Sequence, residues 1–519
     1  MQHEALSRRS VLGGGIVAAT TAAIGGGLWA LRGTARRTVD PAACPLDHLV
    51  LVMMENRSFD HLLGRLPGVD GLDAGMACTG DDGSQTFVHR QRDMTCTVGD
   101  LPHGFSDGIE CWNEGANDGF VRSNGPQSMG YMSPLEVPWI YAAAREYAVF
   151  DRWHCSLLAG TWPNRRYALA GTTNGSRDDT FDSPLGIGYA GRTLLHQLSD
   201  AGISWGVYFT DVPFPALYPD LVLRYGSNFR PMSRFHADAA AGTLPRVVMV
   251  EPGYLIGTDD HPPRNTQLGQ RFMHDVVKSL LYSPLWPRTA CVITYDEWGG
   301  FFDHVAPPVL ADDPPAMGRP AGFRVPGIVV SPWARRGVVS SSVKDHTSWL
   351  RFVQWRFGLP PLSVRNAGAA NLLEVFDFDA PMRTDVPELP VPEVDVKLSQ
   401  LCWLGDHMRP QHDYHFEMPG GEGRESAQAW AQGAAAGPPM TGVDTDGSPV
   451  DVDAAYRAAQ AVPLDGPGFL DAVVTSGAVP RELDLRPRSS AEAVRSPYLD
   501  PASLPAAPLW LGRKGTAVG

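Results

Sequence analysis

The segment LDHLVLVMMENRSFDHLLG, residues 46–64, contains an unbroken apolar run from Leu49 to Met54 that leads directly into Glu55 and Asn56. A short apolar run of this kind is typical of a strand buried on both faces, as in a parallel sheet. The polar residues at its end have two interpretations. They mark the point where the strand reaches solvent, or they belong to a site, because ligands of open parallel sheets bind beyond the carboxyl ends of the strands.

Further apolar, β-branched runs predict the other strands of this sheet. They are ISWGVYF at 203–209, RVVMVEP at 246–252, TACVITY at 289–295 and VPGIVVSP at 325–332. Residues 265–284 and 345–360 show the periodicity of helices, and the first of these places apolar side chains from Leu268 to Leu280 on one face. The alternation of strands with helices predicts an α/β fold with a mostly parallel central sheet flanked by helices.

Length and composition predict three parts of the chain. Its 519 residues exceed the ~250 to 300 at which a single core stops growing. Residues 1–43 are predicted as a signal segment and residues 44–385 as the domain that carries every motif described below. Residues 386–519 are rich in Pro, Ala and Gly, which predicts an accessory, partly disordered C-terminal region.

The charge balance restricts the partners of the protein. The chain carries 57 acidic and 43 basic side chains, for a formal net charge of -14. Bulk attraction to nucleic acid or to an anionic bilayer is therefore disfavoured, and no nucleic-acid partner is expected. A substrate that bears phosphate would need a local cation at its site.

The N-terminus predicts export. Arg8 and Arg9 precede an uncharged, Gly- and Ala-rich stretch, residues 10–31, which resembles a twin-arginine signal with Val11 where that motif usually has Phe. The alternative is one membrane-anchoring helix, since the stretch has about the ~20 residues needed to span a bilayer. Six glycines in the stretch favour the signal. We therefore expect a secreted or cell-envelope protein, cleaved near Ala43 or lipidated at Cys44.

Replacing both Arg8 and Arg9 by lysine is expected to block export through the twin-arginine machinery, because the receptor of that route reads the arginine pair. Cell fractionation and immunoblotting of the wild type and the double variant measure the effect. Normal amounts of the mature variant in the medium or cell envelope would rule this route out.

The seven cysteines fit an exported protein with one or two disulfides, which we expect within the region 78–111. The spacing does not determine the connectivity. No CxxC pair occurs in the sequence, so a cysteine zinc site is disfavoured.

A second strand end also carries acids. In TACVITYDEWGGFFDHVAPP, residues 289–308, Asp296 and Glu297 follow the apolar run directly. If the two strands are parallel, these acids emerge beside Glu55 and Asn56, where so many oxygen acceptors repel one another unless a cation lies among them. The alternative for each acid pair is a helix cap or a surface charge. Taken jointly, the pairs predict a site for a divalent metal.

Four further side chains are candidates for chemistry. Thr161 precedes WPNR and is predicted at a turn before a helix that begins near Asn164, where a cap is the alternative role. His103, His261 and His346 lie in polar loops or at a helix start, as binding residues often do. His304 is a further candidate, with packing of its loop as the alternative.

At this point the motifs resemble a known family. They are, in order, MMENRSFDHLLG, AGTWPNRRYALAGTT, DDHPPRN, YDEWGGFFDHVAPP and DHTSWL, between about residues 46 and 360. Motifs of this length and order are similar to those of the phosphoesterase family, which contains bacterial and plant non-specific phospholipases C and related acid phosphatases. The resemblance implies an alkaline-phosphatase-like α/β fold, one or more divalent metal ions with Ca²⁺ among the candidates, and a hydroxyl nucleophile that becomes transiently phosphorylated.

The resemblance also implies roles for individual residues. Thr161 is the implied nucleophile, and three histidines contact the phosphoryl group or shuttle protons, namely His103, His261 and His346. The implied metal site comprises Glu55, Asn56, Thr161, Asp296 and Glu297. Thr161 lies in a T-x-P-x-R arrangement reminiscent of sulfatases, but those enzymes need Cys or Ser there for conversion to formylglycine. A phosphoester substrate is therefore preferred to a sulfate ester.

Three functions remain open from the sequence. The first is a phospholipase C that contacts a membrane surface transiently and releases diacylglycerol and a phosphorylated head group. The second is a broad acid phosphatase that acts on soluble phosphomonoesters. The third, disfavoured by the intact Thr161 and acid pairs, is a catalytically silent surface-binding protein.

Overall fold

The computed structural model describes residues 39–92, 99–183, 186, 188–254, 257–312, 320–392 and 394, and the backbone of β13 Gly442–Val443 and β14 Pro449–Val450. The predicted signal segment lies outside the described residues up to position 38, as does most of the predicted C-terminal region. Within the described residues, no helix is long and apolar enough to cross a membrane.

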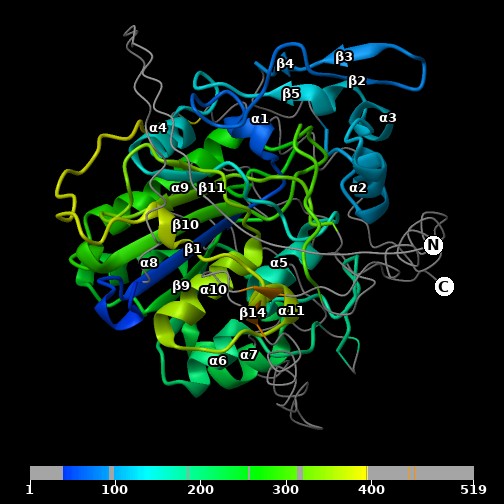
Figure 1. The fold of residues 1–519 in the computed structure, drawn as a ribbon. Helices are drawn as coiled ribbons and strands as arrows, with labels where there is room; N and C mark the ends of the chain where they lie inside the picture. The colour runs from blue at the N-terminus through cyan, green and yellow to red at the C-terminus, as the bar shows by residue number, and fades with distance from the viewer. Residues whose placement is uncertain are drawn as a thin grey trace, which may run out of the picture. The chain divides into compact units, whose positions relative to one another are not determined.

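An eight-stranded sheet forms the centre of the described unit, in the order β12-β6-β11-β10-β1-β9-β7-β8. Figure 1 shows β11, β10, β1 and β9 side by side in this sheet. Its strands are β1 His48–Met54, β6 Ala148–Phe150, β7 Trp205–Phe209, β8 Phe229–Pro231, β9 Val247–Glu251, β10 Thr289–Tyr295, β11 Gly327–Val330 and β12 Val339–Ser340. All neighbouring strands are parallel except at β11, which runs antiparallel to β10 and β6. The predicted α/β class and the mostly parallel sheet are therefore confirmed.

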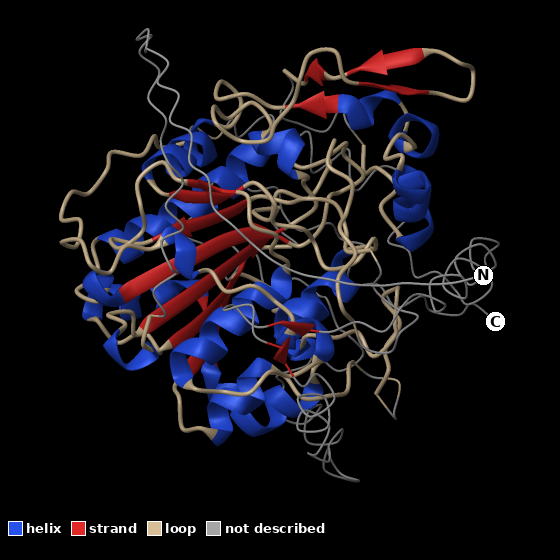
Figure 2. Ribbon diagram, viewed as in Figure 1, coloured by secondary structure: helices blue, strands red, loops and turns tan. Residues whose placement is uncertain are grey.

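Helices cover both faces of this sheet (Figure 2). They are α1 Phe59–Leu63, α2 Phe105–Trp112, α3 Phe120–Asn124, α4 Pro138–Glu146, α5 Thr161–Ala170, α6 Leu194–Asp200, α7 Pro219–Tyr225, α8 Met232–Ala241, α9 Thr266–Leu281, α10 His346–Phe357 and α11 Val364–Ala367. Helix α9 buries the predicted face from Leu268 to Leu280, and α10 ends at Gly358 in the left-handed conformation, which glycine adopts without a steric penalty. Both helices predicted from periodicity are confirmed.

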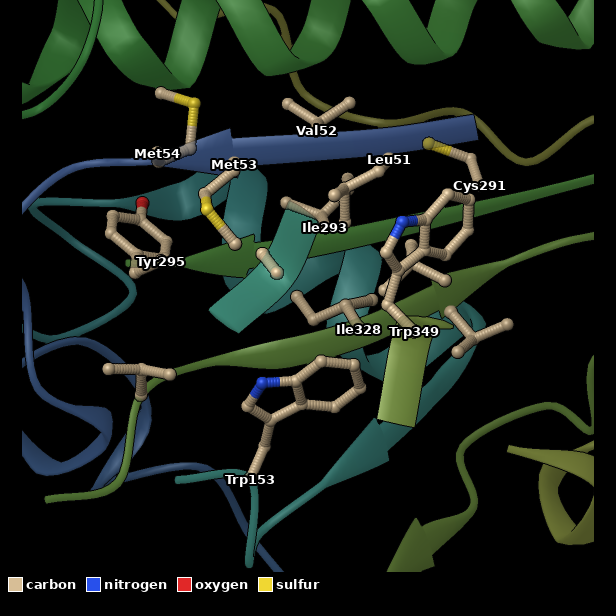
Figure 3. Packing of buried hydrophobic residues seen from close by; sticks show 14 of the residues in the cluster. Leu51, Val52, Met53, Met54, Trp153, Cys291, Ile293, Tyr295, Ile328 and Trp349 are labelled. Atoms are coloured by element: carbon tan, nitrogen blue, oxygen red, sulfur yellow. The ribbon is translucent and has the colours of Figure 1, made fainter. Parts of the chain in front are cut away.

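Strand β1 lies in the middle of the sheet, and its side chains are buried from Leu49 to Met54. Figure 3 shows Val52 and Met54 on one side of the strand and Leu51 and Met53 on the other, as the period of a strand requires. Burying a side chain of this size contributes roughly 1.5 to 3 kcal/mol. This packing fixes the end of β1, and with it the residues that follow.

Short pairings complete the secondary structure of the described residues. The strands β2 Ala77–Thr79 and β3 Gln85–Phe87 form an antiparallel pair, while β4 His89–Arg90 pairs in parallel with β5 Gly130–Tyr131. The strands β2, β3 and β4 lie in the chain between β1 and the loop that carries His103, and β5 follows α3.

The described cysteines are buried free thiols, namely Cys44, Cys78, Cys111, Cys155 and Cys291. No disulfide therefore joins cysteines of the described ranges, while Cys96 and Cys402 lie outside them. The Cys44 side chain is 5% exposed and belongs to the hydrophobic core, which disfavours a lipid on its sulfur.

Candidate active site

Three neighbouring strands end in buried carboxylates. Glu55 follows β1, Asp296 follows β10, and Glu251 is the last residue of β9. The parallel register pairs Met54 with Tyr295, so Glu55 and Asp296 emerge side by side. Each of the three carboxylates is at most 2% exposed. The polar residues after Met54 therefore do not mark an exit to solvent, and the first of the two interpretations of the opening segment is wrong.

The backbone at Asn56 is held tightly against the second acid cluster. Asn56 has φ 58°, and its N–H donates to Asp296 Oδ1 at 3.0 Å. Gly299, with φ 63°, lies so close that a Cβ atom there would be 2.0 Å from the Asn56 carbonyl oxygen. Glycine is needed at 299 both for its conformation and for the space beside Asn56.

Thr161 is the first residue of α5, and Gly160 is the N-cap. The helix begins three residues earlier than the predicted start near Asn164, because Pro163 is compatible with the first turn, where backbone N–H groups lack helical partners. The hydroxyl of Thr161 therefore does not cap the helix, contrary to the alternative reading of this residue.

The Thr161 hydroxyl points at the strand-end acids instead. Its Oγ1 donates to Glu55 Oε2 at 3.0 Å and lies 3.3 Å from Asn56 Oδ1. The structure thus brings the predicted nucleophile into direct contact with two predicted metal-site residues that precede it by more than 100 positions.

Arg165 lies behind these groups and was not predicted from the sequence. Its Nη2 is 2.7 Å from Glu55 Oε1, its Nη1 is 3.0 Å from Glu251 Oε2, and its Nε is 3.0 Å from Asp296 Oδ2. Two signals could have indicated these residues. Arg165 is one helical turn after Thr161, and Glu251 ends the run RVVMVE in the same way that Glu55 follows β1.

Burial and the neighbouring Asp296 disfavour ionisation of Glu55 and Glu297. Burial, followed by the neighbouring Asp296, raises the pKa of Glu55 well above its usual value, although Arg165 opposes this. Burial raises the pKa of Glu297 to about 8 even though His103 lowers it. A bound cation would favour the charged forms of both carboxylates.

The donor set fits a divalent cation. Glu297 Oε2 accepts from the Gly299 N–H at 2.6 Å, whereas the buried Glu297 Oε1 accepts no hydrogen bond from any residue that the structure describes. Carboxylate, amide and hydroxyl oxygens are the ligands of hard cations such as Ca²⁺ and Mg²⁺. The five predicted metal residues supply oxygens of these three kinds.

His103 lies on the open side of the acids. Its Nε2 is 3.1 Å from Asn56 Nδ2 and 3.8 Å from Glu297 Oε1. Burial lowers the pKa of His103, but Glu297 and Asp100 outweigh this effect and raise it to about 9. The neighbouring carboxylates thus favour the cationic form of His103, which is suited to contact a phosphoryl group or to donate a proton.

His261 lies beside His103, with their ring centroids 5.9 Å apart. Asp100, His103 and His261 each offer a ligand atom within 4.8 Å of the others, which forms a second candidate cation position. His103 Nδ1 donates to the Leu101 carbonyl oxygen at 2.6 Å, so Nε2 is the ring nitrogen left for a cation at this position. The strand-end acids offer more oxygen ligands, which hard cations prefer, and are the better candidate.

His346 and His304 are placed differently. His346 is fully buried, its Nε2 donates to the Asp296 carbonyl at 2.6 Å, and its Nδ1 accepts from Trp153 at 3.3 Å. Both ring nitrogens thus contact protein, so the structure places His346 behind Asp296, and its predicted role towards phosphate stays a prediction. His304 bonds to Asp60 at 2.6 Å and Asp70 at 3.0 Å, which is the packing role considered for its loop.

Comparisons with known proteins identify the family to which this chain belongs. The model of the Phosphoesterase family matches residues 46–360, a range that contains every predicted site residue. A non-hemolytic phospholipase C of Pseudomonas aeruginosa is 32% identical over 412 residues, which cover 66% of this chain and 59% of that protein. The non-specific phospholipase C6 of Arabidopsis thaliana is 32% identical over 400 residues, which cover 67% of this chain and 75% of that protein.

Among solved structures, a Vibrio parahaemolyticus protein in the alkaline phosphatase superfamily is 9% identical, with a TM-score of 0.30. That match covers 60% of this chain and 67% of the other.

Proposed function

Since this chain belongs to the Phosphoesterase family and is a phosphoric ester hydrolase, we propose that it is an exported, metal-dependent phospholipase C. Its products would be diacylglycerol and a phosphorylated head group. The observation that carries the proposal is the contact of the Thr161 hydroxyl with Glu55 at the start of α5. It supports a hydroxyl nucleophile among acids that can bind a cation.

In the first half-reaction, Thr161 Oγ1 attacks phosphorus and the bond to the diacylglycerol oxygen breaks. Glu55 Oε2 accepts the hydrogen bond of the Thr161 hydroxyl at 3.0 Å and is therefore placed to accept its proton. Protonated His103 gives its proton to the departing alkoxide. The phosphorylated head group is then attached to Thr161 as a covalent intermediate.

In the second half-reaction, water attacks phosphorus and the bond to Thr161 Oγ1 breaks. His103, now neutral, accepts a proton from that water, and Glu55 returns its proton to Thr161 Oγ1, which restores the hydroxyl. Thr161 begins α5, and the unpaired N–H groups of the first helical turn would favour negative charge on a phosphoryl group bound there.

The cation would be held by Glu55, Asn56, Thr161, Asp296 and Glu297. When bound, a divalent cation neutralises charge on phosphoryl oxygens and lowers the pKa of a hydroxyl that it contacts. Within the protein, Arg165 balances part of the negative charge of the strand-end carboxylates.

An acid phosphatase acting on soluble phosphomonoesters is the second candidate, because it would use the same groups. One feature beside the nucleophile favours the phospholipase. Trp162, which follows Thr161 directly in the sequence, stacks on Phe181 with ring centroids 5.3 Å apart, and both side chains are partly exposed. An aromatic pair there offers an apolar surface to a lipid that passes transiently from a membrane into the site.

The test compares two substrates on one preparation of the mature protein. Mixed micelles of phosphatidylcholine are expected to yield phosphocholine and diacylglycerol at least about tenfold faster than p-nitrophenyl phosphate yields phosphate, since an apolar mouth and a diester site favour the lipid. Chelation should abolish both reactions and a restored divalent cation should recover them. Phosphate release from the monoester alone would support the phosphatase, and no release from either substrate would support a binding protein.

A further inference from the structure

We propose that Arg165 is a positioning residue that orients Glu55 towards the Thr161 hydroxyl, and that Glu251 and Tyr254 hold Arg165 in place. The inference rests on the proposed hydrolysis through Thr161. It concerns residues that the metal site and the phosphoryl contacts do not include.

The two oxygens of Glu55 face different partners. Oε1 lies 2.7 Å from Arg165 Nη2, and Oε2 accepts the hydrogen bond from Thr161 at 3.0 Å. Because the carboxylate is rigid, fixing Oε1 also fixes the direction of Oε2. Thr161 and Arg165 are four residues apart on α5, so both lie on the same face of this helix. That face carries the hydroxyl and also the guanidinium group that orients Glu55, the acceptor of the hydroxyl.

Arg165 is itself held from the side away from Thr161. Its Nη1 donates to Glu251 Oε2 at 3.0 Å, and its guanidinium carbon lies 5.1 Å from the centroid of the Tyr254 ring. The Tyr254 hydroxyl donates to the same oxygen of Glu251.

Backbone contacts complete the environment of the guanidinium group. Nη2 lies 3.2 Å from the Met53 carbonyl oxygen and 3.4 Å from that of Met54, at the end of β1. The Arg165 side chain is 2% exposed, and its planar guanidinium group contacts residues at the ends of three strands. A lysine ammonium has neither the fork nor the reach for these simultaneous contacts.

The positive charge of Arg165 lies among three buried carboxylates. Glu55, Asp296 and Glu251 are buried carboxylates that all contact Arg165, and without it they would repel one another in a medium that screens poorly. Glu55 would then turn away from its neighbours, and its Oε2 would no longer be set against Thr161.

The next residue offers a matched control. Arg166 is also buried in α5, but it pairs with Asp182 at 2.5 Å and lies 4.3 Å above the Tyr189 ring. These partners of its guanidinium include none of the three strand-end acids, although the type of residue, the helix and the burial are the same.

The experiment compares Arg165→Lys, Arg165→Met and Glu251→Gln with Arg166→Lys in the full-length mature protein. Equilibrium dialysis measures binding of Ca²⁺ alone, and steady-state kinetics use whichever of p-nitrophenyl phosphorylcholine and p-nitrophenyl phosphate the wild type hydrolyses. Thermal unfolding measures stability. A wild type that cleaves only the monoester would end the phospholipase proposal and still allow the test of Arg165.

Arg165→Lys is expected to lower kcat or Ca²⁺ affinity about 10- to 100-fold, the usual effect of losing an outer-shell partner. KM should change less than threefold, because the residue does not face the substrate. Glu251→Gln, which loosens Arg165 without touching Glu55, should lower kcat in the same direction, whereas Arg166→Lys should lower it less than threefold.

Wild-type kcat and Ca²⁺ affinity in folded Arg165→Lys would overturn the proposal. Equal losses in Arg165→Lys and Arg166→Lys would do the same, since they would indicate a general effect on α5. If Arg165→Met fails to fold, the lysine and Glu251→Gln variants still decide the question.

Discussion

Thr161→Ala is expected to lower kcat by roughly 10³-fold or more, because removal of a nucleophile eliminates the covalent route and leaves only the surrounding electrostatics. The hydroxyl contacts Glu55 at 3.0 Å and has no role as an N-cap, a position that Gly160 occupies. Stability should therefore change by less than the about 0.5 to 2 kcal/mol that loss of a cap costs. Substrate binding should persist, since the acids and His103 remain.

Thr161→Ser is the matched control, because it keeps the hydroxyl and removes only a methyl group. It should retain measurable turnover. Acid quenching of the wild type during turnover should trap a phosphorylated group on Thr161, detected by peptide mass spectrometry. Normal turnover by Thr161→Ala, with no modified peptide in the wild type, would instead indicate direct attack by water.

Glu297→Gln is expected to lower the occupancy of the cation and to reduce kcat about 100-fold while the fold persists. The amide can still accept the hydrogen bond that Gly299 donates to Oε2, and the substitution removes charge from Oε1, which has no hydrogen bond within the described part of the chain. Elemental analysis of the purified variant measures the metal directly. Full occupancy with wild-type activity would exclude Glu297 from the metal site.

Asp296→Ala provides the contrast. This variant should also lose the cation and the activity. In addition, the substitution removes the acceptor for Arg165 Nε and for the backbone N–H groups of Asn56 and Glu297. Breaking a buried ion pair in this way costs about 3 to 5 kcal/mol. We therefore expect a fall in the melting temperature for Asp296→Ala that Glu297→Gln does not show.

The strands and the two main helices could be predicted from local patterns. Buried runs such as 49–54 and 289–295 are continuous and apolar, and strand ends in a parallel sheet meet at one edge. The direction of β11 could not be predicted, because a fully buried run reads the same in either orientation. Short strands such as β12, with two residues, leave no periodic signal.

For the site, residue types and order were sufficient to propose the acids and Thr161, but not the contacts between them. Arg165 acts through partners on three strand ends, up to 131 positions away in sequence. The same limit applies to His346, which the sequence places at a helix start but whose ring turns into the core against Asp296. Such directions depend on tertiary packing, which no local pattern encodes.

The central place of β1 also matters while the protein is being made. Its partners β9 and β10 begin at Val247 and Thr289, so β1 leaves the ribosome about 190 residues before either neighbour exists. At ~5 to 20 residues per second, this apolar strand waits roughly 10 to 40 s with both edges unpaired. During that interval it is an aggregation-prone segment, because open apolar edges recruit other chains. The strand at the centre of the finished sheet is thus without its two neighbouring strands for much of the synthesis of the chain.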